Sequence, residues 1–163
     1  AAIEGDVATT RDAERLKERG VLALQINTEQ LSATCHLDAR MVQQAIDRLP
    51  LDDVDVLFIE NVGNLVCPAA FDLGEDMKVA ILSVAEGEDK PLKYPRLFRE
   101  SRVTLINKID LLPHVRCDLQ AIERNLRMIQ PDLRIFRLSA LTGEGVELWA
   151  RWLTEQLGAK RLS

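Results

Sequence analysis

The sequence predicts an α/β fold, in which helices cover both faces of a mostly parallel sheet. Two observations predict it. Short apolar runs rich in β-branched residues alternate with segments of helical periodicity along the whole chain, and such alternation forms parallel sheets through right-handed crossovers. The runs are also mostly continuous, as strands buried on both faces are. A length of 163 residues favours one domain, residues 1–163.

Each element follows from its own pattern. The apolar runs predict strands at residues 21–27, 54–60, 79–84, 102–107 and 134–139. Apolar residues at helical spacing predict helices at residues 10–19, 37–49, 117–129 and 145–157. Thr9 and Thr10 are candidate N-caps of the first helix and Gly20 is its stop signal. Residues 1–6 are typical of the end of a strand that runs into a functional loop.

In an open α/β sheet, ligands bind outside the carboxyl ends of the strands. The segments that follow the predicted strands therefore map the candidate site. They are residues 5–6, 28–36, 61–67 and 86–93, and the polar motifs that begin at Asn107 and Ser139. Residues 86–95 form a charged, proline-bounded segment, which predicts a solvated loop that serves as a partner surface or a nucleotide cover.

The motif Asn107-Lys108-Ile109-Asp110 closes an apolar run and indicates guanine recognition of the kind found in P-loop GTPases. The Asp110 carboxylate can accept bonds from guanine N1–H and the 2-amino group, a pair that adenine lacks. Asn107 would face the N7/O6 edge of the base, and the Lys108 stem would lie over its plane. Alone, a four-residue match of this kind is more often a strand followed by a polar turn.

A second motif supports the guanine interpretation. Ser139-Ala140 follows another apolar run about 30 residues later, and the Ala140 N–H is placed to bond guanine O6. Glu60-x-x-Gly63 ends a predicted strand where an acid would hold Mg²⁺ and a glycine would admit the γ-phosphate. Asp6 could orient Mg²⁺ or the attacking water. The alternatives are a strand-ending acid with a turn glycine, and an Asp that starts a helix.

Cys35, His36 and Cys67 offer two thiols and one imidazole, donors suited to Zn²⁺ or Ni²⁺. The alternative is a buried thiol and a satisfied histidine. Because the two segments follow strands expected to be neighbours, their loops could converge. Three ligands leave a tetrahedral site incomplete, so the fourth would be water, another side chain or a residue of a second protomer. His114 and Cys117 form a weaker pair, structural or superficial.

The composition excludes several classes of protein. A net charge of −5 argues against nucleic-acid and anionic-membrane surfaces. No apolar run approaches the roughly 20 residues of a membrane span. Three cysteines are an odd and sparse set, unlike a secreted disulfide framework. A cytoplasmic protein with reduced thiols is expected.

Six segments together resemble one family, the hydrogenase nickel-incorporation GTPases, accessory proteins that help deliver nickel to [NiFe]-hydrogenase. The resemblance covers essentially the whole chain, and its long central blocks are far more specific than a generic GTPase signal. The segments are IEGD (3–6), CHLDA (35–39), FIENVGNLVCPAAFDLGE (58–75), EGEDKPLKYP (86–95), NKIDLLP (107–113) and SALTGEG (139–145).

The resemblance implies a P-loop GTPase-like domain that forms a homodimer on GTP binding and couples slow GTP hydrolysis to metal handling. It implies that Cys35, His36 and Cys67 are dimer-proximal nickel or zinc ligands, and that Asn107, Lys108 and Asp110 determine base specificity. The implied cofactors are GTP or GDP with Mg²⁺. The implied partners are the hydrogenase large subunit and other nickel-delivery accessory proteins.

Two departures from the family stand out. The link at residues 29–34 is longer than usual and lacks glycine. No G-x-x-x-x-G-K-[ST] motif occurs in the sequence, although the family carries one upstream. The chain is therefore interpreted as the C-terminal portion of the GTPase domain, N-terminally incomplete and inactive as a GTPase by itself. Alternatives are a metal-binding chaperone module without catalysis, or a urease-type nickel accessory GTPase.

Overall fold

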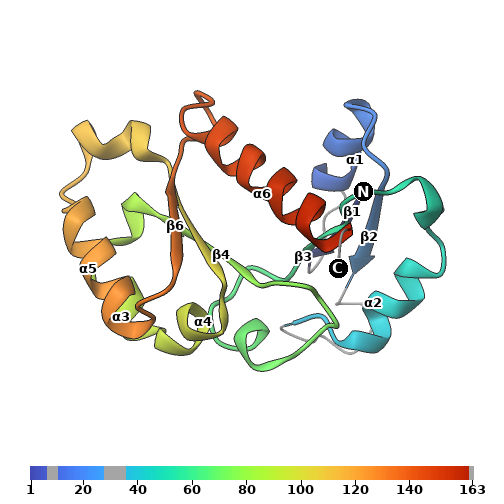
Figure 1. Cartoon of the computed structure of the whole chain (residues 1–163), viewed down its shortest axis with the longest axis horizontal. Coiled ribbons are helices and arrows are strands. Elements are labelled where there is room, and N and C mark those ends of the chain that lie inside the picture. The colour runs from blue at the N-terminus through green and yellow to red at the C-terminus, as the bar shows by residue number, and fades with distance from the viewer. Residues whose placement is uncertain (7–10, 28–35, 162–163) are drawn as a thin grey trace. The chain divides into compact units, whose positions relative to one another are not determined.

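A computed structural model of the chain describes residues 1–6, 11–27 and 36–161. The strands are β1 (Ala2–Asp6), β2 (Ala23–Asn27), β3 (Phe58–Glu60), β4 (Val79–Ser83), β5 (Val103–Asn107) and β6 (Arg134–Arg137). The α-helices are α1 (Arg11–Glu18), α2 (Ala39–Ile46), α3 (Lys90–Lys93), α4 (Pro95–Glu100), α5 (Leu119–Ile129) and α6 (Val146–Arg161), labelled in Figure 1 where there is room.

The chain divides into two compact units, Ala1–Glu75 and Asp76–Ser163. The first holds a three-stranded sheet in the order β2-β1-β3, and the second holds a three-stranded sheet in the order β4-β5-β6. Every strand pair in both sheets is parallel. The predicted class of parallel strands with covering helices is therefore confirmed, with the hydrogen-bonded strands grouped three and three.

A core of the first unit forms around Ile3 of β1. Ile3 is fully buried and packs in a cluster with the α2 residues Val42 and Ala45. The helix α2 begins after Asp38, whose side chain accepts a bond from the Met41 N–H at 2.8 Å. This cap explains why the helix starts two residues later than the predicted residue 37.

The second unit has apolar contacts on both faces of its sheet. Along β5, Ile106 points into a cluster that includes Phe98 of α4 and Ile122 and Leu126 of α5. Its neighbour on the opposite face, Leu105, belongs to a cluster against which α6 packs. Side chains alternate between faces along a strand, so one strand separates two cores, and helices cover both faces as predicted.

The segment at 84–100, which includes the solvated loop predicted at 86–95, contains helices instead. It contains a short 3-10 helix (Val84–Glu86) followed by α3 and α4. Two pairs of opposite charges lie four residues apart, with Lys90 Nζ 2.9 Å from Glu86 and Lys93 Nζ 2.7 Å from Asp89. Such spacing favours helical turns. The sequence prediction took the high charge of the segment as a sign of a solvated loop and did not consider the spacing of the opposite charges.

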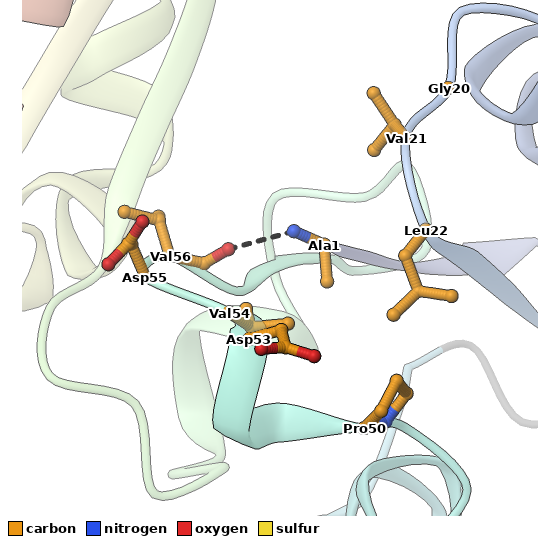
Figure 2. A pocket seen from close by; sticks show the side chains of 9 residues that line it. All are labelled: Ala1, Gly20, Val21, Leu22, Pro50, Asp53, Val54, Asp55 and Val56. Carbon is orange, nitrogen blue, oxygen red and sulfur yellow. Dashed lines mark hydrogen bonds between the residues drawn. The ribbon is translucent and has the colours of Figure 1, made fainter.

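The amino ends of the first sheet's strands surround an open pocket, shown in Figure 2. Its lining includes Leu22, Pro50 and Val56, and the Ala1 amine donates a bond to the Val56 carbonyl at 2.9 Å. Because the strands are parallel, this pocket lies at the edge opposite to the predicted ligand edge. Among the described helices, none has the length and hydropathy that a membrane crossing requires.

Candidate functional site

The guanine motif begins where β5 ends. Asn107 is the last residue of the strand, and Lys108 adopts a left-handed conformation with φ of 62°. The Asn107 Oδ1 atom accepts bonds from the Lys108 N–H at 2.7 Å and from the Ala140 N–H at 3.1 Å. The structure therefore brings the two predicted guanine motifs together through one side-chain acceptor. In this arrangement the Ala140 N–H, predicted to bond guanine O6, donates to Asn107.

Asp110 lies in the 3-10 helix Ile109–His114 that follows the turn at Lys108. Its Oδ1 atom is buried and has no hydrogen-bond partner among the described residues. A buried polar atom without a partner costs free energy, and native structures rarely retain one without a reason. The orphaned acceptor fits a ligand that brings N–H donors, which is what guanine offers and adenine does not.

The loop after β6 is closed by its own hydrogen bonds. Ser139 is fully buried, and its Oγ accepts from the Thr142 N–H at 3.1 Å while its carbonyl accepts from the Gly143 N–H at 2.9 Å. Gly145 has φ of 75°, and a Cβ there would lie 2.1 Å from the Arg137 carbonyl oxygen. Glycine is thus required at 145, and the loop holds Ala140 beside Asn107 in a fixed path.

Two acidic side chains of neighbouring strands meet in the first unit. Glu4 of β1 and Glu60 of β3 are paired in register. Burial is the largest cause that raises the pKa of Glu4 to about 7, and the neighbouring Glu60 carboxyl raises it further through a shared hydrogen bond and charge repulsion. Concentrated carboxylate oxygens are the donors that Mg²⁺ takes in proteins, so this donor set fits the implied ion.

Two other predicted residues follow the same strand ends. Asp6 is the last residue of β1, and its backbone pairs with Asn27 of β2. Gly63 is exposed, and a Cβ built there meets no atom within 4 Å. No contact among the described residues therefore demands glycine at 63, and the phosphate approach there stays a prediction.

The candidate metal residues are placed in part. Cys35 lies outside the described residues. His36 is half-buried, and its ring stacks on Phe71 with centroids 4.0 Å apart and an angle of 10° between the planes. Cys67 caps the 3-10 helix Pro68–Ala70, and its N–H donates to Asn64 Oδ1 at 3.0 Å. Within the described ranges, His, Cys, Asp and Glu residues form no group of three or more that could hold a metal.

One expectation about these loops is wrong. The strands that precede His36 and Cys67 are not neighbours, because β1 lies between β2 and β3. The two loops are nevertheless joined by Asn61, whose Oδ1 accepts from the Leu37 N–H at 2.9 Å. Sequence reasoning missed Asn61. Its place directly after the strand-ending acid was the available signal, since polar residues at that edge are candidates as a group.

The weaker pair lies in the second unit. Burial raises the pKa of the Cys117 thiol, and the nearby carboxylates of Glu88 and Asp118 raise it further. Glu88 accepts from the Asp118 N–H at 2.9 Å, which ties the 84–100 segment to the start of α5. His114 is exposed. A thiol that stays protonated is a poor metal ligand, so this environment agrees with a structural role for Cys117.

Comparison with known proteins gives the family. The family described as "CobW/HypB/UreG, nucleotide-binding domain" matches residues 1–137. The chain is 53% identical over 156 residues to the hydrogenase maturation factor HypB of Escherichia coli K12, and 54% identical over 160 residues to that of Azotobacter chroococcum. These matches cover 96% and 98% of this chain but 53% and 52% of the relatives. The chain thus spans about half the length of these relatives.

Two crystal structures share the fold. HypB from Helicobacter pylori, in complex with nickel, superposes with a TM-score of 0.92 at 37% identity, covering 98% of this chain and 75% of that one. HypB from Archaeoglobus fulgidus superposes with a TM-score of 0.86 at 38% identity, covering 96% of this chain and 74% of that one. By sequence and by structure, the chain belongs to the CobW/HypB/UreG family of nucleotide-binding proteins.

Proposed function

We propose that this chain reads guanine nucleotides and handles nickel during hydrogenase maturation, as part of a GTPase domain. The names of its relatives support the maturation role, and the nickel complex of the H. pylori protein supports nickel as the cargo. The proposed site residues are those derived from the sequence. In the proposal, Asn107, Lys108, Asp110 and Ala140 contact the base, and Ser139 belongs to the same nucleotide-binding site by holding the loop that carries Ala140.

The buried, unpartnered Oδ1 of Asp110 is the observation that carries the guanine proposal. An acceptor of this kind binds a base that donates two N–H groups more tightly than a base that lacks these donors. The hydrogen bond from the Ala140 N–H to Asn107 Oδ1 supports the same conclusion, because it joins the two motifs that are proposed to contact the base.

The phosphate and metal roles belong to the first unit. In the proposal, Glu60 and Asp6 hold Mg²⁺ or orient the attacking water, and Gly63 admits the γ-phosphate. Mg²⁺ would supply charge neutralisation at the phosphates. The two carboxyl groups paired at Glu4 and Glu60 support this assignment, because their mutual repulsion is what a divalent cation relieves.

Nickel or zinc is the proposed cargo of Cys35, His36 and Cys67. Completion of the site at a GTP-dependent homodimer interface is part of the proposal, as are contacts with the hydrogenase large subunit and with other nickel-delivery accessory proteins. A second candidate role is nickel supply to urease, favoured by a relative in H. pylori J99 named hydrogenase/urease maturation factor HypB, 39% identical over 158 residues.

Base specificity is tested by Asp110→Asn. The amide can donate where the carboxylate only accepts, so preference should move from GTP to XTP. The loss for GTP should be about 2 kcal/mol, the scale of an unpaired buried polar group. NMR titration of the chain with each nucleotide measures both affinities.

The matched control is Asp132→Asn, which makes the same chemical change at an exposed residue outside the two motifs. It should leave the ratio of GTP affinity to XTP affinity unchanged. Equal ratios for the wild type and Asp110→Asn would remove guanine reading from Asp110.

A further inference from the structure

One amide side chain joins the segment of His36 to the segment of Glu60. The Asn61 Oδ1 atom accepts from the Leu37 N–H at 2.9 Å and from the Val62 N–H at 2.9 Å. Leu37 directly follows His36, and Asn61 directly follows Glu60 at the end of β3. A single acceptor therefore fixes the distance between two loops whose ends lie 24 residues apart in the chain.

Leu37 is held a second time by its side chain. It is fully buried in the core of the first unit. It also packs against Gly5 of β1, since a Cβ at Gly5 would lie 2.8 Å from Leu37 Cγ and 2.8 Å from the Glu60 carbonyl oxygen. With its N–H and its side chain both held, Leu37 leaves the preceding residue, His36, little freedom of backbone position.

A second asparagine performs the same task for Cys67. Asn64 Oδ1 accepts from the Val66 N–H at 2.8 Å and from the Cys67 N–H at 3.0 Å. The two acceptors lie three residues apart in the same loop. One sets the backbone beside His36, and the other sets the backbone of Cys67.

We propose that Asn61 is a positioning residue for the metal site, holding His36 where its imidazole can join Cys67 on one metal ion. The inference rests on the proposed function and assigns a role that neither the motifs nor the ligand set contain. Residues that orient metal ligands without touching the metal commonly change metal affinity by roughly 10–100-fold when replaced. Asn61 directly follows Glu60, so the residue that positions His36 lies in the same loop as the residues proposed to contact Mg²⁺ and the phosphates.

Asn61→Ala and Asn61→Asp test the proposal, with Ni²⁺ as the probe. The Ala variant loses the acceptor, and the Asp variant keeps an oxygen that both N–H groups can use. We expect Asn61→Ala to bind Ni²⁺ at least about tenfold more weakly and to lose the imidazole contribution to the nickel X-ray absorption spectrum. Sulfur scattering should remain, and Asn61→Asp should restore both the affinity and the imidazole signature.

Two controls make the outcome decisive. Asn125→Ala removes an asparagine that donates to the Glu88 carbonyl in the second unit, and it should bind Ni²⁺ as the wild type does. Asn61→Ser, whose hydroxyl is one atom shorter, should behave as Asn61→Ala does and replaces it if the Ala variant does not fold.

Each contrary result has its own meaning. Wild-type affinity with an unchanged imidazole signature in Asn61→Ala overturns the positioning role while leaving the nickel site standing. Failure of Asn61→Asp to restore the signature also overturns it, because the acceptor would then not be what matters. A wild-type protein that binds no Ni²⁺ through sulfur overturns the proposed function itself, and this inference with it.

Discussion

At the residue scale, the least expected feature is the pairing of the Glu4 and Glu60 carboxyl groups on neighbouring strands. Sequence reasoning singled out Glu60 but passed over Glu4, because an acid inside a short strand shows nothing of its partner until the register is known. Asp110 is the opposite case. Its motif predicted both its chemistry and its location after a strand, and the structure adds that one of its oxygens is buried without a partner among the described residues.

Glu4 makes stability depend on pH. Its pKa is raised from 4.5 to about 7 in the folded chain, first by burial and then by Glu60. Between these values the folded state holds a proton that the unfolded state has released, so the free energy of unfolding falls as the pH rises from 4.5 through 7. Glu4→Gln removes this loss and should raise the free energy of unfolding by about 2–3 kcal/mol at pH 8 relative to its effect at pH 4.

Urea denaturation at pH 4 and pH 8 measures this difference. Glu100→Gln is the matched control, because it neutralises an exposed carboxyl at the end of α4 and should change little between the two pH values. An effect of Glu4→Gln that is the same at both pH values would show that folding does not raise the pKa of Glu4.

The elements follow the sequence patterns more closely than the contacts between them do. The strands and the four longer helices lie where apolar runs and helical periodicity predicted them, with shifts at their ends. The order β2-β1-β3 was not predictable from these patterns, because periodicity carries no information about which strands pair. For this reason the expected convergence of the His36 and Cys67 loops rested on a wrong strand order. The link that the structure shows is the bond from the Leu37 N–H to Asn61 Oδ1.

A substitution at Gly5 tests the packing between β1 and the loop that carries Leu37. A Cβ at this position would press on the Glu60 backbone carbonyl, which cannot move aside as a flexible side chain could. Gly5→Ala should therefore lower the free energy of unfolding by about 1–3 kcal/mol, the usual cost of overpacking. Chemical denaturation of the variant and the wild type measures the change.

Gly158→Ala supplies the comparison within α6. A Cβ there meets nothing within 4 Å, and glycine in a helix interior is less stable than alanine by roughly 0.5–1 kcal/mol. This variant should be slightly more stable than the wild type. If Gly5→Ala were equally harmless, the close approach of Leu37 to β1 would not hold in solution.

At the scale of the whole molecule, the two chemistries are divided between the two units. The candidate acid and metal residues all lie within Ala1–Glu75, whereas the guanine-reading residues all lie within Asp76–Ser163. Family membership was predictable from the sequence because the segments that resemble the family occur in both units. The metal site was less predictable, because its ligands come from separate loops and its proposed completion requires a second copy of the chain.

Nickel X-ray absorption is the most direct test of the central proposal, that this chain carries a thiolate nickel site in its first unit and guanine-reading motifs in its second. We predict sulfur scatterers from Cys35 and Cys67 together with an imidazole from His36. Affinity should weaken as the pH falls, because the thiols must lose protons to bind. Cys67→Ala should remove sulfur and sharply lower the affinity, whereas Cys117→Ala should change neither, since burial keeps that thiol protonated. A spectrum with only nitrogen and oxygen neighbours around nickel would contradict the account.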